Sequence, residues 1–313
     1  MGVRVIVRDW LSANHIVLLQ PGCNVVVDTG HVSRAQETLE RLRNPQFLGE
    51  GPLHLIVNTH CHSDHMGGNA LLARTYHAPV AVPSGEAPLI RSWDTRRLWL
   101  EYADQRSERF TVGEELHPDA FYQWGGLRWQ AIAAPGHDMG ALVFYCADEG
   151  LLISGDALWE NGFGIVMPQE PEALAATRDT LEALAKLDVR VVIPGHGPPF
   201  SDFSGAMERA FSRLQAFEAD PLRMARGVLK AMLTFMLLER GRLPVSTLAA
   251  YLDGVAIYRE YNTLYFSLRP QALADLLVGE LSRTGAIRRS GAFLLPGDAI
   301  LGRERSSRRA GSI

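Results

Sequence analysis

Short apolar runs separated by turn residues dominate roughly the first two thirds of the chain. Runs rich in Val, Ile and Leu that end at Gly, Pro, Asn or Asp are typical of β-strands. Strands are therefore predicted within residues 1–10, 15–30, 53–60, 78–83, 127–137, 141–147, 150–156 and 189–196. The range 15–30 holds two strands, because Pro21 and Gly22 interrupt it.

Apolar residues at helical spacing lie between several of these strands. Helices are predicted over 33–43, 69–77, 91–105 and 171–187. Ser33 is the expected N-cap of the first helix, since its hydroxyl can accept a bond from a free backbone amide. Strands that alternate with helices in this way predict an α/β fold in which two sheets are covered by outer helices.

A different pattern begins near residue 216, where apolar residues recur at helical spacing. Helices are predicted over 223–241, 244–252 and 270–285. Two apolar runs around Ser290 and Gly291 then predict a β-hairpin. Three helices followed by a hairpin resemble a winged-helix module. We therefore predict a smaller, helical, winged-helix-like domain over 216–300 and a disordered tail over 301–313.

The composition indicates a globular protein with a large core. The chain has 313 residues, of which 47% are hydrophobic and 21% charged, and its formal net charge is −4. A length of this kind predicts one large domain and a smaller one. The mild acidity argues against a protein that grips nucleic acid over its whole face, although a local basic patch is still allowed.

The number and spacing of the cysteines and the hydropathy of the chain indicate the cellular compartment in which the protein is expected. The three cysteines form no CxxC pair, so the sequence predicts neither a disulfide framework nor a zinc finger, and a reducing cytoplasm fits best. Charged residues interrupt the apolar N-terminus, which therefore lacks the pattern of a signal peptide. No run approaches the roughly 18 apolar residues of a membrane span, so we expect no membrane association.

The segment THCHSDHMGG, residues 59–68, carries the most distinctive chemistry, and we call it the metal loop. His60 and His62 are two positions apart and can hold one ion, while Asp64 and His65 can turn towards a second ion. Imidazole and carboxylate ligands together suit zinc, iron or manganese better than calcium or magnesium. A polar loop that happens to be rich in histidine is the alternative.

Three later strand ends make that alternative harder to sustain. His137 follows an apolar run in APGHDMG, Asp156 does so in SGDAL, and His196 does so in IPGHG. Each polar residue follows a glycine, which lets the backbone pass close to a crowded polar centre. Any one of them alone is more typical of a turn residue than of a ligand. The metal loop and these three strand ends, in this order along the chain, together indicate one shared metal site.

With these motifs the sequence resembles the metallo-β-lactamase superfamily over residues 1–215. The resemblance implies an αββα sandwich with a two-metal site at one edge of the paired sheets. It implies that the first metal is held by His60, His62 and His137, and the second by Asp64, His65 and His196. Asp156 would bridge the two metals, and Asp28 would orient the loop without binding metal.

The resemblance also implies cofactors and a reaction. Two divalent transition-metal ions are expected, zinc before iron or manganese, and they would share a hydroxide that acts as the nucleophile. Asp64 would orient that hydroxide or move its proton. A bridging aspartate such as Asp156 occurs in glyoxalase II, lactonase and ribonuclease branches, whereas true zinc β-lactamases lack it. Antibiotic hydrolysis therefore ranks lower.

Several other residues invite a functional interpretation beside a structural one. Cys61 lies within the metal loop but should point away from the metals. Structural or surface roles are expected for His15, His31, His54, His77 and His117. Substrate contacts or simple packing are the alternatives for Trp93, Arg96, Arg97, Trp99 and Tyr102. The same alternatives hold for a second loop, which ranks slightly higher as a specificity element because it follows Asp156 and contains Trp159, Asn161 and Phe163.

Three functions from different classes fit these motifs. The favoured one is hydrolysis of a small thioester, ester or lactone, and the second is single-strand endoribonuclease activity, known in a superfamily subgroup with a winged-helix-like tail. The third is a metal-containing binding or sensing protein with little turnover, and an iron-dependent sulfur oxygenase can share the motif.

Charge favours the small-molecule hydrolase. A nuclease should gather Lys and Arg along a track to the metals, yet Lys186 and Lys230 are the only lysines. The arginines near the predicted hairpin are Arg283, Arg288 and Arg289, with others in the tail. That region could instead serve contacts in a homodimer.

Overall fold

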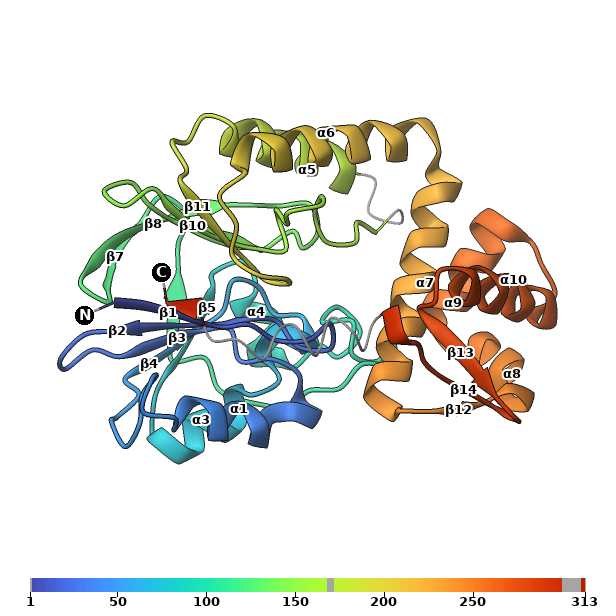
Figure 1. Cartoon of the computed structure of the whole chain (residues 1–313), viewed down its shortest axis with the longest axis horizontal. Coiled ribbons are helices and arrows are strands. Elements are labelled where there is room, and N and C mark those ends of the chain that lie inside the picture. Colours follow the sequence, from blue (N-terminus) through green and yellow to red (C-terminus); the bar gives the residue numbers. More distant parts are fainter. Residues whose placement is uncertain (1, 168–171, 300–310, 313) are drawn as a thin grey trace.

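The computed structural model describes residues 2–167, 172–299 and 311–312. Its larger part has four layers, in which two β-sheets face each other and helices cover both outer faces (Figure 1). Val27 and Val57 of one sheet and Phe144 and Ile153 of the other contribute to the core between the sheets. The predicted αββα arrangement is therefore confirmed.

The first sheet has the strand order β15-β1-β2-β3-β4-β5-β6. Its strands are β1 (Gly2–Ile6), β2 (His15–Leu19), β3 (Val25–Val27), β4 (Leu55–Val57), β5 (Val80–Pro83), β6 (Glu114–Leu116) and β15 (Gly311–Ser312). Every residue of β3 and β4 is buried, because a strand covered on both faces needs a continuous apolar run. The strands from β3 to β6 are parallel, so their carboxyl ends meet at one edge.

The second sheet has the strand order β11-β10-β9-β8-β7. Its strands are β7 (Phe121–Trp124), β8 (Leu127–Ala133), β9 (Leu142–Cys146), β10 (Leu151–Gly155) and β11 (Val191–Pro194). They pair antiparallel except for β10 and β11, which are parallel. The segments after β10 and β11 therefore leave the sheet on the same side.

The sandwich also contains several helices. They are η1 (Val32–Arg34), α1 (Ala35–Leu42), α2 (Ser63–Met66), α3 (Asn69–Tyr76), α4 (Ala87–Ser92), α5 (Ala173–Leu184) and α6 (Phe203–Ala219). The first sheet is covered by α1 and α3, and the second by α5 and α6 (Figure 1). A separate apolar core lies under each helical layer.

The remainder of the chain packs beside the sandwich and begins with the long helix α7 (Figure 1). Its elements are α7 (Pro221–Arg240), β12 (Leu243–Pro244), η2 (Val245–Thr247), α8 (Leu248–Gly254), α9 (Ala256–Tyr261), the π-helical turn η3 (Asn262–Phe266), α10 (Pro270–Arg283), β13 (Ile287–Ser290) and β14 (Phe293–Pro296). The predicted helices and the antiparallel hairpin are present. The predicted boundary between residues 215 and 216 stays a prediction, and that position lies within α6.

The N-cap prediction at Ser33 is wrong. Ser33 lies inside η1, whose N-cap is His31, and the His31 side chain accepts a hydrogen bond from the Ser33 backbone amide. The His31 ring also lies 2.8 Å from the Ser33 hydroxyl. The imidazole thus satisfies the Ser33 amide, and α1 begins after Arg34 without a side-chain cap.

The helix predicted over 91–105 is also wrong. α4 ends at Ser92, and the chain continues in turns with positive φ at Trp93, Trp99 and Asp104. Left-handed residues of this kind cannot continue a right-handed helix. Leu98 and Leu100 are instead buried under the first sheet, so tertiary packing overrides the local helical pattern.

Two further expectations concern the tail and the membrane. Of the tail predicted to be disordered, residues 301–310 and 313 lie outside the described residues, whereas Gly311 and Ser312 pair with β1. None of the helices in the described part of the chain combines the length and the apolar character needed to span a bilayer.

Candidate metal centre

The loop after β4 carries four of the predicted ligands. His60 and His62 precede α2, and Asp64 and His65 lie within that single-turn helix. Because β4 is buried and lies between β3 and β5, the loop that follows it begins in the interior of the protein. His60 and His65 are consequently almost fully buried.

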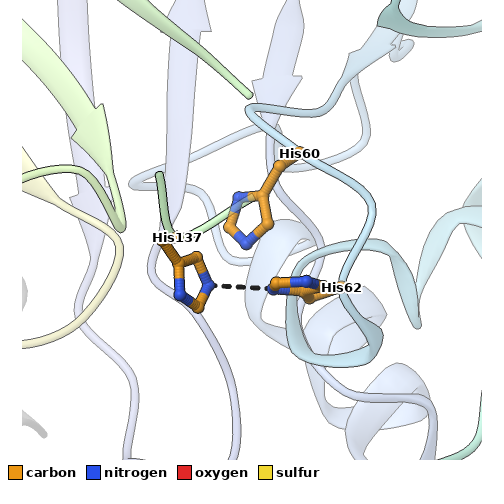
Figure 2. Close-up of side chains that lie close together, drawn as sticks. All are labelled: His60, His62 and His137. Atoms are coloured by element: carbon orange, nitrogen blue, oxygen red, sulfur yellow. Dashed lines mark hydrogen bonds between the residues drawn. The ribbon is translucent and has the colours of Figure 1, made fainter. Parts of the chain in front are cut away.

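His60, His62 and His137 form one group. Figure 2 shows the three rings converging, with His137 arriving from the segment between β8 and β9. One ligand atom of each residue lies within 4.8 Å of one from each of the others. His62 Nδ1 and His137 Nε2 are 2.8 Å apart. Three imidazoles in this arrangement could hold a transition-metal ion.

Asp64, His65 and His196 form a second group by the same criterion. His196 follows β11, and its Nε2 lies 3.0 Å from Asp64 Oδ2. His65 Nε2 lies 3.9 Å from the same carboxylate oxygen.

Asp156 lies between the two groups. Its Oδ2 is 3.4 Å from His137 Nε2, and its Oδ1 is 3.4 Å from His65 Nε2. Asp156 also forms a third cluster of ligand atoms with His60 and His65. The structure therefore brings all seven predicted ligands together around one carboxylate.

Gly195 explains how two strand ends approach so closely. A side-chain carbon at this position would overlap the carboxylate of Asp156 and crowd the ring of His65. Only glycine leaves room for the backbone there. The glycine before His196 therefore packs against the site.

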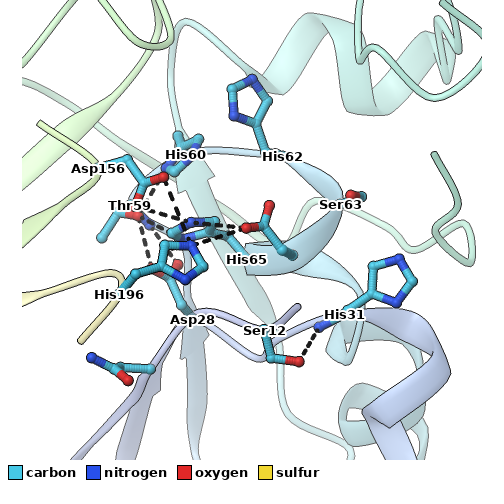
Figure 3. A network of polar contacts seen from close by, with 12 residues as sticks. Ser12, Asp28, His31, Thr59, His60, His62, Ser63, His65, Asp156 and His196 are labelled. Atoms are coloured by element: carbon cyan, nitrogen blue, oxygen red, sulfur yellow. Dashed lines mark hydrogen bonds and ion pairs between the residues drawn. The ribbon is translucent and has the colours of Figure 1, made fainter. Parts of the chain in front are cut away.

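Asp28 supports the metal loop from behind, as the network in Figure 3 shows. Its carboxylate accepts hydrogen bonds from the Thr59 amide at 2.9 Å, the Thr59 hydroxyl at 2.8 Å and His65 Nδ1 at 2.8 Å. Because Nδ1 faces Asp28, Nε2 of His65 faces the cluster. The expectation that Asp28 orients the loop agrees with this geometry.

Burial affects the protonation of the histidines of the two groups in different ways. Burial lowers the pKa of His62 to about 4, and burial together with His62 lowers the pKa of His137 to about 4. Both rings are thus neutral at pH 7, the form that binds metal. Burial opposes a charge on His65, but the carboxylates of Asp28 and Asp156 help to raise its pKa well above the ordinary value.

The Asp64 carboxylate remains ionised. Burial alone would raise its pKa, yet His65 and His196 outweigh burial and lower the pKa of Asp64 to about 2. A buried carboxylate that stays charged can bind a cation without first losing a proton.

Metal ions fit these residues. His60 Nε2 and His65 Nε2 are buried and have no hydrogen-bond partner, although buried polar atoms in folded proteins almost always have one. Both atoms belong to the ligand clusters. A bound cation would satisfy them, and a mixed imidazole and carboxylate donor set suits zinc, iron or manganese.

A cavity of about 310 Å³ opens over the cluster. His62, Asp64, His137, Asp156 and His196 lie on its floor. Its walls are mainly apolar and include Trp10, Leu98, Trp99, Trp159, Ile165, Met232, Phe235, Leu238 and Leu281. A substrate that reaches the cluster must therefore leave water and enter largely apolar surroundings.

The structure separates the other candidate residues into two sets. Trp99 packs against His62 with ring centroids 4.6 Å apart, and Trp159 donates to Asp156 Oδ1. Both line the cavity, whereas Phe163 and Cys61 are buried in apolar cores beside the site.

The Tyr102 hydroxyl donates to Glu260, and Trp93 packs against Phe110. The remaining histidines are absent from the ligand clusters found among the described residues, namely His15, His31, His54, His77 and His117.

Four residues near the site were not predicted. Trp10 stacks on His196 with centroids 5.2 Å apart, and Asp138 Oδ2 lies 3.5 Å from His62 Nε2. Lys230 and Phe235 reach the cavity from α7. Asp138 could have been suspected because it follows His137 directly. The other three lie far from the ligands in sequence and carry no local signal.

Known proteins resemble the chain in both sequence and fold. A family model described as "Metallo-beta-lactamase superfamily" matches residues 8–196. The hydroxyacylglutathione hydrolase of Ectopseudomonas mendocina (strain ymp) is 30% identical over 174 residues, which cover 55% of this chain and 57% of that protein. The corresponding protein of Albidiferax ferrireducens is 36% identical over 166 residues, 51% of this chain and 53% of its own. The chain thus spans about half the length of these curated relatives.

A solved structure extends the likeness in fold. The metallo-beta-lactamase family protein TTHA1429 of Thermus thermophilus aligns with a TM-score of 0.56 over 94% of this chain and 98% of its own, at 22% sequence identity. This similarity concerns the fold alone.

Proposed function

Because this chain belongs to the metallo-beta-lactamase superfamily, we propose that it is a metal-dependent hydrolase of a small thioester or ester. One observation carries the proposal: clusters of imidazole and carboxylate groups, with Asp156 between them, lie on the floor of an apolar cavity. The curated relatives named hydroxyacylglutathione hydrolase support the acyl class of substrate.

We assign His60, His62 and His137 to one metal and Asp64, His65 and His196 to the other, with Asp156 shared. When bound, two divalent cations would supply Lewis-acid activation of water and of the scissile carbonyl. Zinc fits these donors, and iron or manganese would fit them as well.

The residues of the chain supply positioning and proton transfer. Asp64 is the group that we expect to orient the attacking water or to shuttle its proton, because it is a carboxylate that lies 3.0 Å from His196 Nε2. Asp28 holds the His65 ring in the orientation that turns Nε2 to the cluster. Trp10 and Trp159 cover His196, which limits the access of bulk water to the site.

A nuclease is less favoured by the surroundings of the cluster. The cavity walls are apolar, and Lys230 is the one Lys or Arg among the described residues that line them, whereas a nucleic-acid backbone needs several cations along its path. A single-strand endoribonuclease therefore stays the second candidate.

The test combines metal analysis with a substrate panel. Protein expressed with zinc, iron or manganese is analysed for bound metal and then assayed on thioesters, esters, lactones, phosphodiesters and short RNA. We expect about two ions per chain and turnover of an acyl substrate that a chelator abolishes. His60→Ala should lose metal and activity, while His117→Ala, at an exposed histidine outside the clusters, should lose neither. A metal-free protein with unchanged turnover would contradict the proposal.

A further inference from the structure

A second depression adjoins the apolar cavity, and we call it the basic groove. It has a volume of about 740 Å³ and lies along α6 and the start of α7. Its basic lining residues are Arg209, Arg213, Arg223 and Lys230, with Asn161 and Ser212 as neutral polar neighbours. Lys230 lines the cavity as well as the groove. The two depressions therefore share the Lys230 side chain as part of their walls.

Part of the positive charge of the groove is neutralised within the protein. Arg209 binds Asp202 at 3.0 Å and donates to the Glu160 carbonyl, and Lys230 lies 3.1 Å from Glu280. Lys230 is nevertheless about one-third exposed, so its ammonium group keeps donors free for a ligand.

Arg213 and Arg223 are not neutralised. In the described part of the chain neither guanidinium has a carboxylate within ion-pair distance, and Glu208, the one acidic residue of the groove, forms no ion pair there. Arg213 lies over Phe163 and Phe217, with its guanidinium carbon 5.1 and 5.2 Å from the ring centroids. Burial and the nearby charge of Arg223 lower the pKa of Arg213. Among the described residues, the two cations thus lie on one wall without an ion-pair partner.

An anionic ligand would relieve this repulsion. Guanidinium groups bind phosphate through paired, charge-assisted hydrogen bonds. The stacking of Arg213 on two aromatic rings fixes its orientation before a ligand arrives, which reduces the entropy lost on binding. The groove offers neighbouring guanidinium groups, and the cavity that shares Lys230 with it is apolar. The pair would suit a molecule that has a phosphate-bearing end and an apolar end.

We propose that the basic groove binds the phosphate-bearing leaving group of an acyl thioester, while the apolar acyl group occupies the cavity over the metal cluster. This inference rests on the proposed hydrolase function. In the reaction, the oxygen of water forms a bond to the acyl carbon and the carbon–sulfur bond breaks. The products are the carboxylic acid, which loses its proton, and a thiol that retains the phosphates.

The test compares one acyl group on three leaving groups. Hexanoyl-coenzyme A carries phosphates, hexanoyl-glutathione carries carboxylates, and hexanoyl-N-acetylcysteamine carries neither. With metal-replete protein we expect kcat/KM to be at least about tenfold higher for the coenzyme A thioester, as expected for hydrogen bonds to a charged group. Added sodium chloride should raise KM most for that substrate and leave KM for hexanoyl-N-acetylcysteamine unchanged, because salt screens exposed charges.

Variants assign the preference to the groove. Arg223 is exposed, so Arg223→Gln should fold normally and lower kcat/KM for hexanoyl-coenzyme A about tenfold, with hexanoyl-N-acetylcysteamine unaffected. Arg288→Gln, at an exposed arginine of β13 outside the groove, is the matched control and should change neither value. Arg213→Gln should act in the same direction as Arg223→Gln.

The outcomes separate this inference from the proposed function. Equal turnover of the three thioesters, or the same preference in Arg223→Gln, overturns the inference and leaves the hydrolase standing. If no thioester is hydrolysed, the proposed function fails. Binding of the non-hydrolysable S-hexyl-coenzyme A then tests whether the groove binds phosphate. Affinity at least about tenfold above that of S-hexyl-glutathione, lost in Arg223→Gln, then supports phosphate binding. Equal affinities, or an effect of Arg223→Gln on RNA cleavage alone, overturn it.

Discussion

Replacing Asp28 by asparagine should loosen the metal loop without changing any ligand. Asp28 has positive φ, 57°, a conformation that asparagine tolerates better than most residues. The substitution therefore removes a negative charge with little backbone strain. The amide oxygen can keep the bond from the Thr59 amide, but the amide nitrogen would face His65 Nδ1 or the Thr59 hydroxyl.

The magnitude follows from the contacts that change. The bond from His65 to Asp28 is 2.8 Å long, and the two side chains are 0% and 1% exposed. Removing one partner of a buried ion pair costs about 3–5 kcal/mol. Since the asparagine retains part of the bonding, we expect a loss of about 3 kcal/mol in the free energy of unfolding of the metal-free protein. Metal affinity should also fall about 10- to 100-fold, because His65 loses the group that orients it.

Two measurements check this prediction. Urea unfolding of the metal-free protein gives the change in the free energy of unfolding, and competition with a chelating dye gives the metal affinity. Asp253→Asn is a suitable control, since Asp253 is an exposed residue at the end of α8. If Asp28→Asn matched that control in both measurements, the Asp28 carboxylate would not hold the loop as argued.

Three further predictions concern the cluster, the stability and the cavity. Asp156→Ala should lower occupancy of both metals, whereas His196→Ala should chiefly weaken one, and elemental analysis of both variants decides; two metals retained with full activity in Asp156→Ala would contradict the shared role. Burial raises the pKa of Glu37, but Arg8 and other arginines outweigh burial and lower that pKa below its ordinary value. The Glu37 carboxylate therefore stabilises the protein above the ordinary pKa, and this stabilisation is lost as the pH falls through the pKa of the folded state. The melting temperature of Glu37→Gln should therefore fall less than that of the wild type between about pH 5 and pH 3, and parallel curves would contradict this. Phe235→Ala removes part of the cavity wall and should raise KM for an apolar acyl substrate about tenfold with a smaller effect on kcat; an unchanged KM would show that the acyl group lies elsewhere.

The sequence was most informative where a local pattern coincides with a structural requirement. A buried strand that ends in a polar residue must place that residue at the sheet edge, so the positions of His137, Asp156 and His196 were enough to predict that they lie near the metal loop. The same reasoning predicted two covered sheets. It depended on continuous apolar runs such as Val25–Val27.

Residues joined by long-range packing could not be predicted in this way. Trp10 meets His196 across 186 positions, and Lys230 meets the cavity only because α7 packs beside the sandwich. The apolar residues of the segment 91–105 have helical spacing, yet the segment forms turns in which Leu98 and Leu100 are buried. A local sequence pattern indicates only the intrinsic preference for helix or strand. The conformation and the neighbours of these residues depend on tertiary contacts, which the local pattern does not reveal.

The long helix α7 gives the cavity a wall that is independent of the metal cluster. All seven residues assigned to metal precede residue 197, whereas Met232, Phe235 and Leu238 of α7 line the cavity. A change at one of these positions can reshape the space for the acyl group while the strand ends that hold the ligands stay untouched. Natural variation in α7 could thus alter which acyl groups the cavity accepts while the metal ligands stay the same.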